Sequence, residues 1–211
     1  MPVTTLLFDF DGTLADSLPV LVEITNRLAP EFGYRPTPLD QVDALKGLSA
    51  RQLIWQSQMP LLRLPALLRR VRAELHCESP HLQPFPGIPE TLRSLRSQGH
   101  QCAIVTTNAA DNVQRFLDAH GLTPLFLGVE GGGTLFGKGR LIRRCLQHHA
   151  LNPAHAVYVG DETRDIEAAR KAGLRVAAVT WGFNSAGVLT AAQPDWLVSQ
   201  PQGLLAIADA V

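Results

Sequence analysis

Short apolar runs recur along most of this chain, and they restrict its fold more than any other feature. Each run is nearly continuous, as is typical of a strand that is buried on both faces of a parallel sheet. The strong runs are residues 3–8, 102–105, 156–159 and 176–179, and weaker ones are residues 125–129 and 195–198. A helix-like segment precedes each strong run after the first. The sequence therefore predicts an α/β fold with a doubly wound, mostly parallel sheet.

The alternation of strands and helices is absent from about residue 17 to residue 84, where the sequence predicts helices alone. The expected helices are residues 20–32, 39–45, 50–58 and 61–76. Clusters of turn-forming residues mark both ends of this stretch. The predicted organisation is an α/β core, residues 1–16 and 85–211, with a small all-helical domain, residues 17–84, inserted after the first strand.

Composition argues against several classes of protein. Lys plus Arg and Asp plus Glu both number 19, so no net positive charge attracts nucleic acid or an anionic membrane. The widely spaced Cys77, Cys102 and Cys145 form no CxxC motif of a zinc site or redox pair. Met1 leads directly into the first strand, and no apolar run approaches membrane-spanning length. We expect a cytoplasmic protein, either a monomer or a homodimer, with no nucleic-acid or membrane partner.

Two carboxylates follow the first predicted strand. Asp9 and Asp11 are separated by one residue, and Gly12 allows the chain to turn away. Ligands of an open α/β sheet bind at the carboxyl ends of the strands, so both acids can face that crevice. Such a pair can divide covalent catalysis between a nucleophile and a proton carrier. Without other support, the same residues could form only a turn and a helix cap.

A second acidic cluster, from Gly160 to Asp165, follows another apolar strand and opens a helix. Asp161 and Asp165 are therefore expected at the same edge of the sheet as Asp9 and Asp11. Like charges gathered there need a cation, and carboxylate oxygens without Cys or His favour a hard ion such as Mg²⁺ over zinc. Acids that suit a helix dipole would explain part of this cluster, but not its pairing with the first.

Two further segments could hold phosphate oxygens. Thr106, Thr107 and Asn108 end a predicted strand, where a hydroxyl and backbone N–H groups can cradle phosphate, although a threonine there is commonly a plain helix cap. Lys138 lies in a glycine-rich loop before a helix, where a surface lysine is the simplest interpretation. The spacing of this loop also matches the G-x-x-x-x-G-K of a nucleotide-binding P-loop. That alternative is disfavoured because glycine follows the lysine, where the motif needs Ser or Thr to hold Mg²⁺.

Together and in this order, the four segments resemble the haloacid dehalogenase superfamily, in the phosphatase branch that carries a helical cap and includes phosphoglycolate phosphatases. The resemblance spans almost the whole chain, and Asp-Phe-Asp-Gly-Thr-Leu at residues 9–14 is its specific part. It implies a Rossmann-like core and a magnesium-dependent phosphatase that acts on a small phosphorylated metabolite through an aspartyl-phosphate intermediate.

The resemblance also implies a role for each matching residue. By it, the nucleophile is Asp9, the acid/base is Asp11, the phosphate anchors are Thr106 and Lys138, and the metal ligands are Asp9, Asp11, Asp161 and, through water, Asp165. Thr107 and Asn108 belong to the same phosphate-binding segment as Thr106. Residues 45–49 look like the cap segment that faces the active site in these relatives.

Three functions remain compatible with these residues: a phosphatase, a sugar-phosphate mutase of the same fold, and an interaction protein without catalysis. A dehalogenase is disfavoured because halide displacement needs neither Asp11 nor the acids around Asp161. An inert protein is disfavoured because unused buried carboxylates repel each other and reduce stability. The mutase shares every core residue, and we favour the phosphatase because it requires fewer special cap contacts.

Two groups of residues have no assigned role. His76, His148 and His149 lack the helical i, i+4 partner that a metal site would need, so they are interpreted as solvated surface groups. Residues 181–184 follow the last strong strand, and they could border the crevice or belong to the core and a turn.

Overall fold

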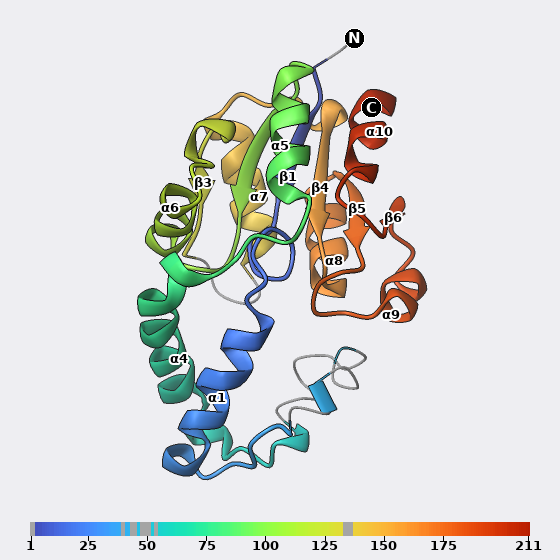
Figure 1. Cartoon of the computed structure of the whole chain (residues 1–211). Coiled ribbons are helices and arrows are strands. Elements are labelled where there is room, and N and C mark those ends of the chain that lie inside the picture. The colour runs from blue at the N-terminus through green and yellow to red at the C-terminus, as the bar shows by residue number, and fades with distance from the viewer. Residues whose placement is uncertain (1–2, 39–40, 43–45, 47–51, 53–54, 133–136) are drawn as a thin grey trace.

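A six-stranded sheet with the order β3-β2-β1-β4-β5-β6 forms the centre of the computed structural model (Figure 1). The structure describes residues 3–211 except 39–40, 43–45, 47–51, 53–54 and 133–136. The strands are β1 (Thr5–Phe8), β2 (Gln101–Val105), β3 (Val129–Glu130), β4 (Ala156–Gly160), β5 (Arg175–Val179) and β6 (Trp196–Val198). Every neighbouring pair of these strands is parallel. The predicted α/β fold is confirmed.

Helices cover both faces of the sheet, which explains why its central strands read as continuous apolar runs. The helices on one face are α5 (Ile88–Ser97), α6 (Ala110–Ala119) and α10 (Gly203–Ala210), and those on the other are α7 (Lys138–His148), α8 (Thr163–Lys171) and α9 (Ala186–Ala191). Leu6 and Phe8 of β1 pack in the first layer and Leu7 in the second, because successive side chains of a strand point to opposite faces. Every residue of β1 and β4 is buried.

The predicted strand at residues 125–129 is wrong in its extent. Thr123–Leu125 forms a 3₁₀ helix (η4), in which Pro124 has no N–H to give to the sheet, and β3 comprises only Val129–Glu130. Leu127 still donates a backbone hydrogen bond of 2.8 Å to Cys102, so the chain approaches β2 before it pairs regularly. An edge strand has a neighbour on one side alone, and fewer bonds specify its length.

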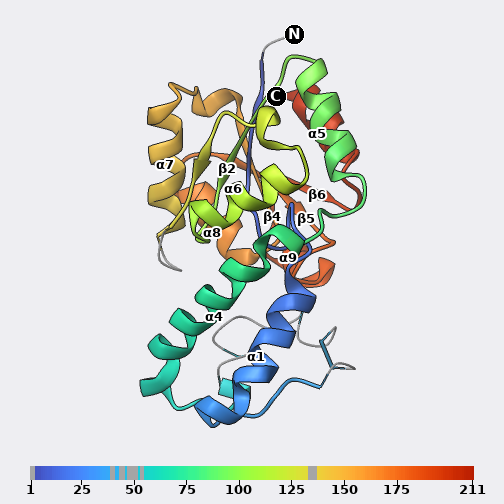
Figure 2. The same cartoon turned by 60° about the vertical axis from the view of Figure 1, so that its left-hand side comes forward.

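The part of the chain between β1 and α5 extends away from the sheet as a helical insert (Figures 1 and 2). Its described elements are α1 (Leu18–Phe32), η2 (Leu61–Arg63), α4 (Leu64–Glu78) and η3 (Ser79–His81), and the described part contains no strand. α1 and α4 pack on each other through a separate apolar cluster that includes Ile24, Leu28 and Leu75. The predicted helices at 20–32 and 61–76 are confirmed within a few residues, and those at 39–45 and 50–58 lie largely outside the described residues. The domain boundaries stay a prediction.

The two chain segments that connect the insert to the core lie side by side. Asp16 donates a backbone hydrogen bond of 2.9 Å to Gln83, and Phe85 donates one of 3.0 Å to Leu14. This pairing places the base of the insert beside the carboxyl end of β1. No helix in the described part of the chain has the length and hydropathy needed to cross a membrane.

Candidate active site

The turn after β1 directs its two acidic residues toward the acidic end of β4. Asp9 extends the pairing of β1 with β4 through a 2.8 Å hydrogen bond from its N–H to Val159. Gly12 has a φ of 77°, and a Cβ there would overlap the Asp161 carboxylate. Glycine at this position therefore serves both the turn and the close approach of the two chain segments.

Asp9, Asp161 and Asp165 form a buried acidic cluster. Each offers a carboxylate oxygen, and the three oxygens lie within 4.8 Å of one another. Asp161 is fixed by two donors: the Thr13 hydroxyl at 2.7 Å from one oxygen and the Phe183 N–H at 2.7 Å from the other. The structure thus brings together the acids that the sequence places after β1 and after β4.

Lys138 is buried inside this cluster and begins α7, so the surface-lysine interpretation is wrong. Its ammonium donates to Asp9 at 2.6 Å and to Asp165 at 2.5 Å. It also lies 5.7 Å from the centre of the Tyr158 ring. One ammonium therefore compensates two carboxylates directly, while the charge of Asp161 has no cation within salt-bridge distance among the described residues.

Burial changes the acidity of Asp9 and Asp161. It raises the pKa of Asp9 from 3.8 to about 7, although Lys138 opposes the rise. Burial also raises the pKa of Asp161 well above its usual range, and the charges of Asp165 and Asp9 add to the effect. Three carboxylates around one ammonium leave the site deficient in positive charge. Since all these donors are carboxylate oxygens, the cluster fits a hard divalent cation.

The segment after β2 lies beside Asp11. Thr106 is buried, and its hydroxyl accepts a 3.1 Å hydrogen bond from the Asn108 N–H. The Asn108 side-chain amide donates to Asp11 Oδ2 at 2.8 Å. Burial raises the pKa of Asp11, and the Ser17 hydroxyl and then this amide oppose the rise. The other oxygen, Oδ1, is buried, and neither it nor the Ser17 hydroxyl makes a hydrogen bond of normal geometry among the described residues. Thr107 is half-buried next to this contact.

Residues 181–184 border the site, a role that the sequence left open. The Trp181 indole N–H donates to the Thr13 carbonyl at 3.0 Å. Phe183 holds Asp161, and the Asn184 side chain accepts from the Thr163 N–H at 3.0 Å. Sequence reasoning missed the support of Asp161 by Thr13 and Phe183. The Phe183 contact uses a backbone group that no side-chain pattern reveals.

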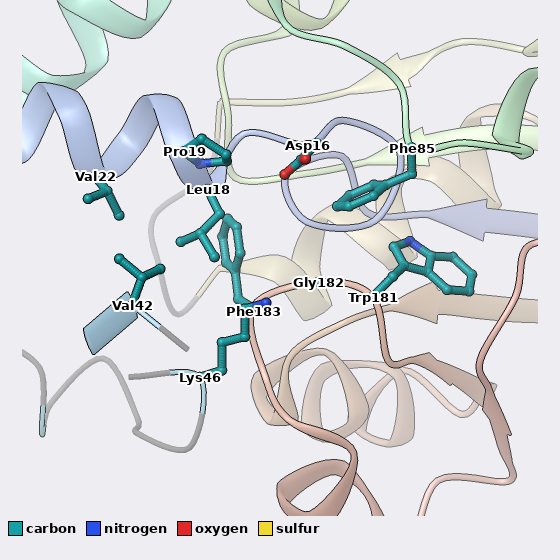
Figure 3. A pocket seen from close by; sticks show the side chains of 10 residues that line it. All are labelled: Asp16, Leu18, Pro19, Val22, Val42, Lys46, Phe85, Trp181, Gly182 and Phe183. Carbon is teal, nitrogen blue, oxygen red and sulfur yellow. The ribbon is translucent and has the colours of Figure 1, made fainter. Parts of the chain in front are cut away.

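A cavity of about 370 Å³ adjoins this loop, between the insert and the core (Figure 3). Its lining is mostly apolar, with Trp181 and Phe183 from the core and Leu18 and Val22 from α1. In the described part of this lining, Lys46 is the basic residue and Asp16 is the acidic residue. Burial raises the pKa of Asp16 and the charge of Lys46 opposes that rise, so the two groups are close enough to interact.

His148 is more than a solvated surface group. Its Nδ1 lies 3.0 Å from one oxygen of the buried Glu130, and Arg144 holds the other oxygen at 2.5 Å. His149 lies near enough for the three residues to approach a metal ion. Since Arg144 and His148 already occupy both carboxylate oxygens, the simplest role of this cluster is to fasten α7 to β3.

Comparisons with known proteins agree with this geometry. A family model described as haloacid dehalogenase-like hydrolase matches residues 6–179. The chain is 42% identical over 200 residues to a phosphoglycolate phosphatase of Synechococcus elongatus, covering 95% of this chain and 94% of that protein. It is 32% identical to a phosphoglycolate phosphatase of Aliivibrio fischeri, covering 97% and 96%.

Solved structures show the same architecture. A predicted phosphoglycolate phosphatase from Haemophilus somnus superimposes with a TM-score of 0.77 at 27% identity, covering 97% of both chains. A predicted phosphatase from Clostridium acetobutylicum has a TM-score of 0.86 over 100% of both chains. Its 21% identity supports the fold alone.

We expect Mg²⁺ to raise the melting temperature more at about pH 8 than at about pH 5.5. The raised pKa of Asp9, about 7 against 3.8, means that the folded protein holds this proton more tightly than the unfolded chain. Its contribution to stability is fully present below about pH 4 and is lost as pH rises through about 7. A cation replaces the proton at the higher pH. Thermal unfolding with and without MgCl₂ measures the effect, and Asp161→Asn should abolish it. Equal shifts at both pH values would contradict this account.

Proposed function

The chain belongs to the haloacid dehalogenase-like hydrolase family and is a phosphoric monoester hydrolase, and on that premise we propose that it hydrolyses 2-phosphoglycolate with Mg²⁺ as cofactor. The observation that carries the proposal is the contact of the buried Lys138 ammonium with Asp9, which favours the ionised carboxylate against the effect of burial. The activity of the curated relatives, which the chain matches along almost its whole length, supports the choice of substrate.

Two carboxylates share the chemistry in the proposed mechanism. An Asp9 oxygen forms a bond to phosphorus while the ester oxygen leaves, and Asp11 gives that oxygen its proton. In the second step Asp11 takes a proton from water, whose oxygen bonds to phosphorus and releases Asp9. Thr106 and Lys138 hold the phosphate oxygens. Asp9 and Asp161, with support from Asp165, would hold Mg²⁺, whose charge would favour the approach of a phosphate dianion.

The cavity supplies a reason for a substrate with a second negative charge. Phosphoglycolate carries a carboxylate close to its phosphate, and Lys46 is the basic group in the described lining. The Lys46 carbonyl accepts a 2.9 Å hydrogen bond from the Ser185 N–H, which fastens this part of the insert to the core. We propose that the Lys46 ammonium binds the substrate carboxylate.

The test of the substrate is phosphate release with Mg²⁺ from 2-phosphoglycolate, glycerol phosphate and glucose phosphates. The proposal predicts the highest kcat/KM for the carboxylated ester. Release of phosphate from sugar phosphates alone would contradict the substrate, and an isomerised sugar phosphate without release would indicate the mutase.

Replacing Lys46 should weaken binding of the carboxylated substrate specifically. We expect Lys46→Met to raise KM for 2-phosphoglycolate roughly tenfold or more, because a hydrogen bond to a charged group is lost. KM for glycerol phosphate should change little. Arg69→Met, at an exposed position of α4, is the matched control and should behave as wild type. An equal rise of KM for both substrates would contradict the role of Lys46.

The isosteric amides at the two catalytic positions should fail differently. Asp9→Asn cannot form the acyl phosphate, and its turnover should fall by about 10⁴-fold or more. Asp11→Asn loses the proton carrier, worth about 10²–10⁴-fold on an alkyl phosphate, and should recover much of the first step on an aryl phosphate. Single-turnover labelling should then show phosphoenzyme in Asp11→Asn and none in Asp9→Asn. A labelled Asp9→Asn protein would contradict the assignment.

A further inference from the structure

A chain of three hydrogen bonds runs from the helical insert to Asp11. His76 Nδ1 on α4 lies 2.7 Å from Asn112 Oδ1 on α6. Asn112 Nδ2 donates to Asn108 Oδ1 at 2.9 Å. Asn108 Nδ2 donates in turn to Asp11 Oδ2 at 2.8 Å. His76, which the sequence suggests is a solvated group, therefore reaches the acidic site through two amides.

Each link in this chain fixes the direction of the next. The Asp11 carboxylate can only accept when ionised, so Asn108 must present its NH₂ group and turn its carbonyl oxygen away. That oxygen accepts from Asn112 Nδ2 and also from the Ala109 N–H at 2.8 Å. Asn112 consequently presents its own oxygen to His76, which must hold a proton on Nδ1. All three bonds donate toward the carboxylate.

The first link crosses between two parts of the fold. Asn112 is only 2% exposed and lies in the core, whereas the His76 side chain is 45% exposed and belongs to the insert. His76 Nδ1 also lies 3.4 Å from Asp111 Oδ2. The Arg115 guanidinium donates to the His76 backbone carbonyl at 3.3 Å. The contact that completes the chain therefore forms only when the end of α4 is seated against α6.

We infer that His76 and Asn112 are positioning residues that hold the Asn108 amide, and through it the Asp11 carboxylate, in the orientation needed for proton transfer. This inference rests on the proposed role of Asp11 as acid/base. Without the Asn112 contact, the Ala109 N–H is the one remaining donor to Asn108 Oδ1 among the described residues. Rotation of the Asn108 side-chain amide would then turn its carbonyl oxygen, in place of its NH₂ group, toward the Asp11 carboxylate. The chain therefore links the seating of α4 to the orientation of the Asp11 carboxylate, whose other oxygen, Oδ1, is buried without a hydrogen-bond partner among the described residues.

The test compares His76→Ala with wild type on an alkyl and an aryl phosphate. Misplacing the acid should slow the first step only for the ester that needs protonation. We therefore expect the rate of enzyme phosphorylation in a single turnover to fall about three- to tenfold with 2-phosphoglycolate and to stay near wild type with 4-nitrophenyl phosphate. His76→Asn places an amide NH₂ where Nδ1 was and should restore the rate. His81→Ala, an exposed histidine on η3, is the control and should match wild type.

A second readout does not need activity. The Asn108 side-chain amide resonance in ¹H–¹⁵N spectra should shift in His76→Ala, remain near wild type in His76→Asn, and not move in His81→Ala. An unchanged Asn108 resonance, or an equal loss of the phosphorylation rate on both esters, would overturn the inference. If wild type hydrolyses no phosphate ester, the proposed function fails, while the Asn108 resonance still tests the chain itself.

Discussion

The buried ammonium of Lys138, shared by Asp9 and Asp165, is the interaction on which the rest of the site depends. Three carboxylates at the end of a central strand pair repel one another, and moving charged groups out of water is costly unless they are paired. Lys138 supplies part of the compensation from the first turn of α7, which in turn is fastened to β3 through Glu130. The remaining negative charge is what a hard divalent cation would compensate.

The fold serves this cluster by bringing separate chain segments to one edge of the sheet. β1 and β4 are neighbours, so the turn that carries Asp9 meets the segment that carries Asp161. Close approach is possible because Gly12 and Gly182 have no side chain to intrude on Asp161. The insert completes the surroundings from the side: Lys46 lines the adjoining cavity, and α4 contributes His76 to the chain of amides that ends at Asp11. These contacts join the insert to the residues at the sheet edge.

The sequence could predict what depends on local pattern. The buried strands are recognisable as apolar runs. Asp9, Asp11 and Asp161 directly follow those runs, so the sequence predicts that these acids meet at one edge of the sheet. Lys138 could be selected by family resemblance, but its burial depends on how α7 docks. The extent of β3 was wrong because few interactions specify an edge strand. His76 and Asn112 could not be found, because their contact joins an insert helix to a core helix and neither residue belongs to a motif. The roles of the site residues remain predictions that chemistry must test.

The central claim is that Asp9 becomes covalently phosphorylated, and trapping that bond tests it most directly. Borohydride reduces an acyl phosphate to an alcohol, which would convert the phosphorylated aspartate into homoserine. Wild-type protein should be mixed with 2-phosphoglycolate and Mg²⁺, quenched with borohydride during turnover, digested and sequenced by mass spectrometry. The account predicts homoserine at position 9, dependent on substrate. Active protein with no homoserine, or with homoserine at position 11 or 161 in place of position 9, would contradict it.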